Sequence, residues 1–109
     1  MENITNNKMA AVGNKDTVQI FKSVGMDVYF ETDADGLRDI LRALVAREYA
    51  IVLIPEQDAE KVSDYLNIRS THPYPIFLTV PDGVSNSGYS VEQAKRKMEK
   101  AMGTVGGFK

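Results

Sequence analysis

The chain contains no cysteine, no tryptophan and a single histidine among its 109 residues. Without cysteine it can form no disulfide, thiol nucleophile or cysteine-based zinc site. The longest apolar run, Tyr49 to Ile54, is far shorter than the ~20 residues of a membrane-spanning helix. The opening MENITNN has neither the charged nor the apolar region of a signal peptide. We therefore expect a cytoplasmic protein without covalent cross-links.

The composition is 43% hydrophobic and 26% charged, which is typical of one soluble domain. A net charge of −2 argues against general nucleic-acid binding. The charge is nevertheless uneven: from residue 90 onward there are five basic and two acidic residues, against eight basic and thirteen acidic residues before it. The C-terminal segment therefore differs electrostatically from the rest of the chain.

Four short apolar runs predict strands, at residues 8–13, 27–31, 50–54 and 76–80. The third run, AIVLI, shows no alternation of apolar and polar residues, as expected for a strand buried on both faces of a parallel sheet. Pro55 and Pro81 are expected to end the third and fourth strands.

Helical periodicity separates these strands. The strongest pattern lies between the acidic start Asp33/Asp35 and the basic end Arg42/Arg47, with apolar residues at i, i+3, i+4, i+7 and i+8: Leu37, Ile40, Leu41, Leu44 and Val45. An earlier helix is expected to begin at Asp16, with Gln19 completing a capping-box-like start, and to stop at Gly25. A short third helix would bury Ala59, Val62 and Tyr65 or Leu66.

The alternation of strands and helices predicts the fold class: an α/β domain over residues 8–81, with a small doubly wound four-stranded parallel sheet and flanking helices. Residues 1–7 would form an N-terminal extension. Residues 82–89 are rich in Gly, Ser and Asn and predict a flexible linker. A further helix is expected over residues 90–103, starting at Ser90 and ending at Gly103, followed by a tail at 104–109.

The last helix carries a narrow apolar stripe flanked by basic residues. This pattern is typical of a helix that lays its apolar face on a partner while charges at the rim select that partner. The predicted interface consists of Val91, Ala94, Lys95, Lys97, Met98, Ala101 and Met102. The alternative is that the stripe packs on the chain's own sheet beneath a solvated basic face.

Ligands of doubly wound sheets bind outside the carboxyl ends of the strands. The turn after the first strand, Gly13 to Thr17, has neither the G-x-G-x-x-G pattern nor a P-loop. The metal pocket of a receiver domain is not assembled either, because the third strand is followed by Pro55-Glu56-Gln57. Asp16, Glu56 and Asp82 could share this edge, although helix capping and turn formation explain them more simply.

His72 lies in the loop between Thr71 and Pro73, with no nucleophile or metal partner suggested by spacing. We therefore expect no catalytic residue, cofactor or metal site. A receiver-like or nucleotide-sensing module that uses Gly13, Asp16 and Glu56 is the alternative function.

Four segments stand out in order along the chain: the opening Met9 to Val18 with Phe21 and Gly25, the run Ile51 to Gln57, the proline-bracketed Pro73 to Pro81, and the terminal Met98 to Gly103. Together they resemble the F subunit of V-type and archaeal A-type rotary ATPases. The resemblance covers residues 8–103. The sequence departs from the family pattern at Asn14, where the family has Asp, and at Pro55, where it has Thr.

This resemblance implies a non-catalytic subunit of the central stalk. The protein would bind the coiled-coil D subunit, contact the catalytic-head subunits, and couple ATP hydrolysis or synthesis to ion transport. It would need no cofactor and would meet the membrane only through the complex.

Overall fold

The computed structural model describes residues 8–81 and 91–104; within the second range, the described side chains are those of Glu92, Gln93 and residues 96–100. The predicted extension 1–7, the linker 82–89 and the tail beyond Thr104 lie outside these residues. In chain order the elements are β1 (Met9–Gly13), α1 (Lys15–Val18), the 3-10 helix η2 (Gln19–Val24), β2 (Asp27–Phe30), α2 (Ala34–Ala46), β3 (Ile51–Pro55), α3 (Glu56–Lys61), α4 (Ser63–Arg69), β4 (Ile76–Val80) and α6 (Val91–Thr104).

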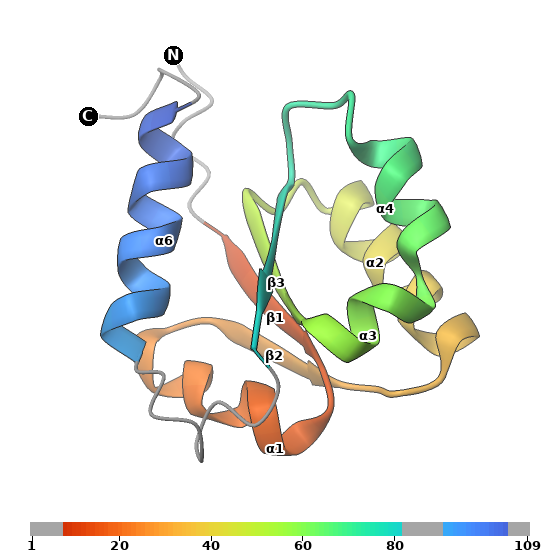
Figure 1. The fold of residues 1–109 in the computed structure, drawn as a ribbon, viewed down its shortest axis with the longest axis horizontal. Coiled ribbons are helices and arrows are strands. Elements are labelled where there is room, and N and C mark those ends of the chain that lie inside the picture. The colour runs from red at the N-terminus through yellow and green to blue at the C-terminus, as the bar shows by residue number, and fades with distance from the viewer. Residues whose placement is uncertain (1–7, 82–90, 105–109) are drawn as a thin grey trace.

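The four strands form one parallel sheet in the order β2-β1-β3-β4 (Figure 1). Strand β3 is buried along its whole length, as its unbroken apolar run predicts. Its register sets Ile51 beside Ile76 and Pro55 beside Val80. The predicted α/β class with a four-stranded parallel sheet is therefore confirmed.

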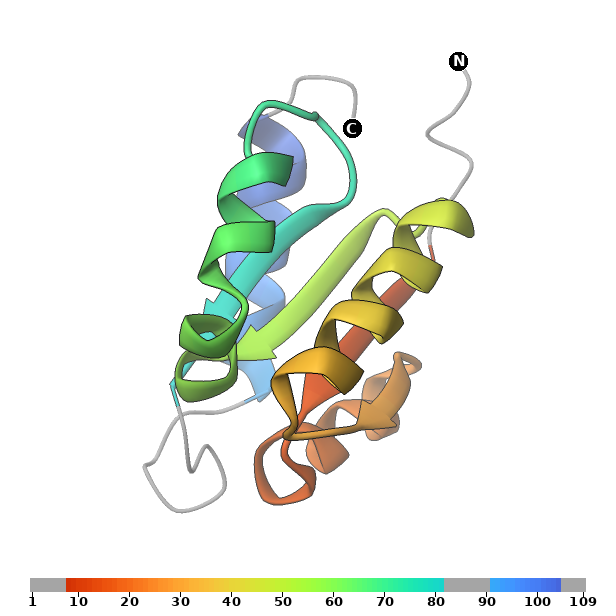
Figure 2. The same cartoon turned by 90° about the vertical axis from the view of Figure 1, so that its right-hand side faces the viewer.

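Helices cover both faces of the sheet. Helices α2, α3 and α4 lie on one face, and α1, η2 and α6 lie on the other (Figures 1 and 2). Successive residues of β1 and β3 point to opposite faces and form two cores. One core contains Val12, Leu41 and Ile54, and the other contains Phe21, Leu53 and Met98.

The first crossover differs from the predicted helix. Asn14, rather than Asp16, is the N-cap, because its backbone is extended and its side-chain oxygen accepts from Thr17 N. The α-helix ends at Val18 and continues as η2, so the predicted single helix is wrong in type. Its predicted stop is confirmed, since Gly25 adopts a left-handed φ of 88°.

The second crossover matches its periodic pattern. Helix α2 is capped by Asp33, whose side chain accepts from Asp35 N and Gly36 N. It buries Leu37, Leu41 and Leu44. Ile40 and Val45 lie at its border and are partly buried.

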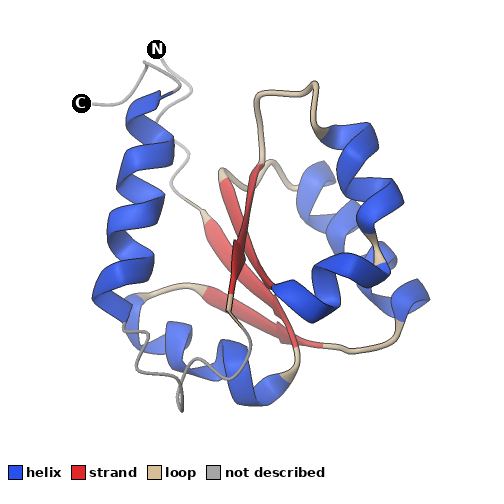
Figure 3. Cartoon of the chain, in the orientation of Figure 1, coloured by secondary structure: helices blue, strands red, loops and turns tan. Residues whose placement is uncertain are grey.

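The predicted third helix is two helices (Figure 3). The chain leaves helical geometry at Val62, where φ is −124° and ψ is 26°. Val62 is fully buried, whereas α4 beyond it buries no residue and Tyr65 and Leu66 are only partly covered. The break therefore separates a helix packed on the sheet from one that lies near the surface.

The C-terminal helix runs to Thr104, so Gly103 does not end it as predicted. The interior hydrogen bonds of an α-helix do not require a side chain, so a glycine is tolerated there at a cost of about 1 kcal/mol. Ser90, the predicted cap, lies outside the described residues.

Candidate functional site

Helix α6 was predicted to carry the functional surface, and it lies on the face of the sheet opposite α2 (Figure 1). Met98 is its buried residue among those with described side chains, at 6% exposure. It packs in a core cluster with Phe21, Leu53 and Val80. Met98 therefore packs on the chain's own sheet. For this residue the structure agrees with the alternative, in which the apolar stripe covers the sheet and does not face a partner.

Lys97 is exposed and ties α6 to the edge of the sheet. Its Nζ donates to the carbonyl oxygen of Thr79, 2.7 Å away. Thr79 lies on β4, which is an edge strand. A charged donor on an edge carbonyl holds the helix in place and covers part of the unpaired edge.

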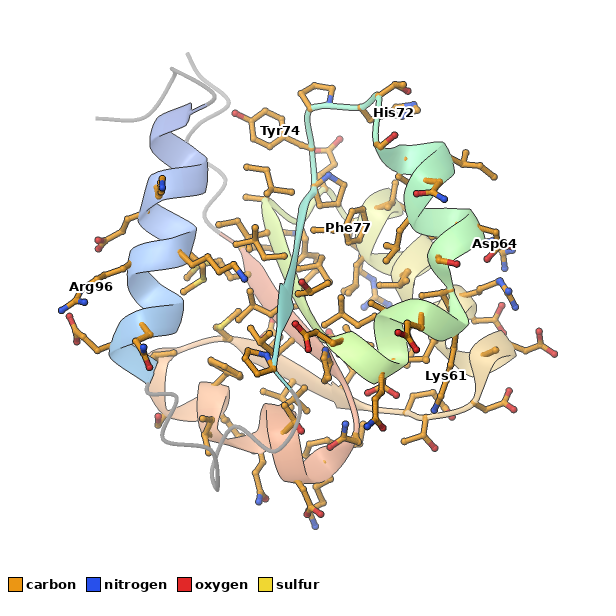
Figure 4. All side chains as sticks on the ribbon, in the orientation of Figure 1. Lys61, Asp64, His72, Tyr74, Phe77 and Arg96 are labelled. Atoms are coloured by element: carbon orange, nitrogen blue, oxygen red, sulfur yellow. The ribbon has the colours of Figure 1, made fainter. Side chains whose placement is uncertain are left out.

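The outward face of α6 is polar. Glu92, Gln93, Arg96, Glu99 and Lys100 are exposed. Figure 4 shows Arg96 projecting away from the sheet. This face is therefore available to another molecule while Met98 remains buried.

The other predicted interface residues, Val91, Ala94, Lys95, Ala101 and Met102, lie on α6, but their side chains are outside the described ones. The predicted interface therefore stays a prediction.

The carboxyl edge of the sheet holds the other candidate residues. Asp16 and Glu56 are exposed, and each stands in the first turn of a helix. Asp82 lies outside the described residues. His72 is exposed in the loop before β4, as expected (Figure 4).

Sequence reasoning missed Asp58, which is 1% exposed. Its Oδ2 accepts from Asn14 N at 3.0 Å and from Asn14 Nδ2 at 3.1 Å. Its Oδ1 lies 3.3 Å from Lys61 Nζ. One signal was available, since Asp58 stands four residues before Val62 and so on the inward face of the predicted helix.

Two ionisable groups elsewhere have shifted pKa values. A hydrogen bond from Arg38 lowers the pKa of Asp64, which is exposed on α4. A hydrogen bond of 2.6 Å to Asp27 raises the pKa of Tyr49, with Tyr29 and burial adding to the effect. Tyr49 links the loop after α2 to β2, and its shift has a structural cause rather than a catalytic one.

Within residues 8–81 and 91–104, no three His, Asp or Glu side chains are grouped to hold a metal ion. The same residues contain no helix that is both long and apolar enough to cross a membrane.

Residues 9–99 match the family model of the ATP synthase (F/14-kDa) subunit. The chain belongs to this family of ATP synthase F subunits. The predicted resemblance to the F subunit of V-type ATPases is therefore confirmed. The match includes β1 through β4 and more than half of α6.

Three bacterial proteins, each named as the F subunit of a V-type ATP synthase, are similar to this chain. The protein of Fusobacterium nucleatum is 26% identical over 97 residues, which are 89% of this chain and 92% of that protein. The protein of Clostridium botulinum is 24% identical over 96 residues, which are 88% of this chain and 93% of that protein. The protein of Clostridium perfringens is 24% identical over 96 residues, with 88% and 91% covered. This chain and its relatives thus match over nearly their whole lengths.

Proposed function

We propose that this chain is a non-catalytic subunit of the central stalk of a V-type ATPase, peripheral to the membrane and on its cytoplasmic side. It binds the coiled-coil D subunit and couples ATP hydrolysis or synthesis in the catalytic head to ion transport. The observation that carries this proposal is the family match over residues 9–99, together with relatives named as F subunits of V-type ATP synthases.

Helix α6 is the surface that this proposal assigns to the D subunit. The helix presents an exposed polar face with Arg96, Lys97 and Lys100, which can meet acidic groups of a partner helix. The predicted contact region, Val91, Ala94, Met98, Ala101 and Met102 with the rim residues Lys95 and Lys97, needs one adjustment. Met98 anchors the helix to the sheet in this structure, and the other apolar residues of the stripe stand three, four or seven positions from it on the same helix face. The contact with the D subunit is therefore assigned to the basic rim and the exposed polar face of α6.

The receiver-like or nucleotide-sensing alternative finds no support at the carboxyl edge. The position between the ends of β1 and β3 contains the chain's own Asp58 carboxylate, already bonded to Asn14 and Lys61. A phosphate there would meet a buried negative charge, and like charges at close range repel.

Purification of the chain from its native source, followed by mass spectrometry of its partners, tests the proposal. Recovery of the D subunit with catalytic-head subunits is the expected result. Recovery of the chain as a free pool, or bound to a sensor kinase, would contradict the proposal.

A further inference from the structure

The place where ligands bind in a doubly wound sheet is set by strand order. In the order β2-β1-β3-β4, the chain moves from β1 to β2 on one side and continues through β3 to β4 on the other. The switch point therefore lies between β1 and β3, at their carboxyl ends. Gly13 ends β1 and Pro55 ends β3 at this place.

The chain itself fills this switch point. A Cβ at Gly13 would lie 2.5 Å from Pro55 Cδ and 2.7 Å from Asp58 Oδ2. These distances are too short for any side chain, so the end of β1 packs directly on Pro55 and Asp58. Gly13 also has a φ of 151°, which an L side chain rarely adopts. Both facts indicate that only glycine fits here.

Both oxygens of the Asp58 carboxylate are in use: one contacts the loop after β1 directly, and the other is linked to the loop after β2 through Lys61. Oδ2 accepts the two Asn14 donors from the turn after β1. Oδ1 faces Lys61 Nζ, which also donates at 2.8 Å to the carbonyl oxygen of Thr32 in the loop after β2. The carboxylate thus connects the loops that follow β1 and β2 to helix α3.

The Asn14 side chain both accepts and donates a hydrogen bond. Its Oδ1 accepts from Thr17 N at 3.0 Å and caps α1, while its Nδ2 donates to Asp58. An aspartate at this position could cap the helix, but it would place a second carboxylate about 3.1 Å from the first. The amide is therefore the group that satisfies both neighbours.

We propose that the Asp58 carboxylate is a built-in anionic ligand of the switch point. The carboxylate occupies the position at which a doubly wound sheet binds a small anion from solution. Through Asn14 and Lys61 it holds the loops after β1 and β2 against α3. The proposal does not depend on the D subunit, so it stands or falls separately from the proposed function.

Asp58→Ala in the full chain tests the proposed role of the carboxylate. Its removal leaves the two Asn14 donors without their acceptor and takes one of two acceptors from the Lys61 ammonium, which keeps its bond to the Thr32 carbonyl oxygen. We expect the melting temperature to fall by about 8 °C or more. The exchange rate of the Asn14 amide proton should rise at least tenfold, because that amide donates to Asp58. Asp16→Asn is the matched control, since it removes an exposed carboxylate from the same turn, and we expect a change within about 2 °C.

Chemical rescue distinguishes a ligand from a packing group. Sodium formate supplies the missing carboxylate to Asp58→Ala, and sodium chloride at the same ionic strength is its control. We expect formate to restore at least half of the lost melting temperature and to slow exchange of the Asn14 amide, while chloride does neither. Equal effects of formate and chloride, or an Asp58→Ala chain that melts within about 2 °C of the parent, would overturn the proposal.

Asn14→Asp and Asn14→Ser keep the proposal testable if Asp58→Ala does not fold. Both substitutions retain a cap for α1, but only aspartate adds a second carboxylate beside Asp58. We expect Asn14→Asp to melt below Asn14→Ser. An Asn14→Asp chain that melts with the parent or above the serine variant would contradict the assigned contact.

Discussion

Helices α2 and α6 lie on opposite faces of the same sheet and are held in different ways. Helix α2 buries three leucines and has a side-chain cap at Asp33. Among the described side chains of α6, Met98 is buried and the others are exposed. Helix α2 is therefore a layer of the core, whereas the described side chains of α6 anchor it through Met98 and Lys97 and otherwise present an exposed polar surface. Four predictions test this contrast, from the largest expected effect to the smallest.

Leu41→Ala in α2 should lower the free energy of unfolding by about 3 kcal/mol, because the site is fully buried between helix and sheet. Urea denaturation measures the change. Asp39→Ala is the control on the exposed side of the same helix, where we expect a change within about 0.5 kcal/mol. Equal losses of unfolding free energy from the two substitutions would contradict the assignment of α2 to the core.

Met98→Ala in α6 should lower the free energy of unfolding by about 2 kcal/mol. This is at the lower end for a buried methionine, because the described residues around Met98 on α6 are exposed. Met98→Leu keeps the volume and should cost less than about 1.5 kcal/mol. Both values come from urea denaturation of the chain alone. A Met98→Ala chain as stable as the parent would show that α6 is not anchored there in solution.

Reversal of Lys95 and Lys97 to Glu should slow association with the D subunit by roughly tenfold at low salt, and the effect should shrink as salt is added. Loss of the bond from Lys97 to Thr79 should also cost about 1 kcal/mol of stability. Stopped-flow association and urea denaturation separate the two effects. Arg42→Glu with Arg47→Glu reverses two exposed charges on the α2 side and should leave the association rate unchanged.

Asp64→Asn should have the smallest effect. The hydrogen bond from Arg38 lowers the pKa of Asp64 in the folded chain, so its contribution is present near neutral pH and is lost as the pH falls through the folded pKa. Because Asp64 is exposed, solvent screens the pair. Melting curves of the parent and the variant should therefore converge at low pH, and a gap that widens on acidification would show that the sign is wrong.

The sequence predicted all four strands because each is a short apolar run bounded by turn residues or proline, and it predicted α2 because the apolar periodicity spans the helix. It missed the division at Val62 and the 3-10 geometry of η2, since both depend on how a short segment packs on the sheet. The helix cap was placed at Asp16 instead of Asn14 for the same reason. Asn14 caps the helix through its bond from Thr17 N, and its other side-chain bond, to Asp58, joins residues 44 positions apart.

The position of Met98 was open at the sequence level for a different reason. A narrow apolar stripe is compatible with either an internal sheet or an external helix. Only the packing of Met98 with Phe21, Leu53 and Val80 decides for this residue. Asp58 was missed because an acidic residue in the first turn of a helix is common at the surface, and its burial follows from contact with another loop.

The measurement that tests the central claim most directly uses a chain truncated after Gly88, which lacks α6. Its melting curve and its affinity for the D subunit are measured beside those of the full chain. We predict that the truncated chain melts at a lower temperature but still cooperatively, because the four strands and α2 remain, and that it binds the D subunit at least about 100-fold more weakly. A truncated chain that loses cooperative melting, or one that binds the D subunit as tightly as the full chain, would contradict the account.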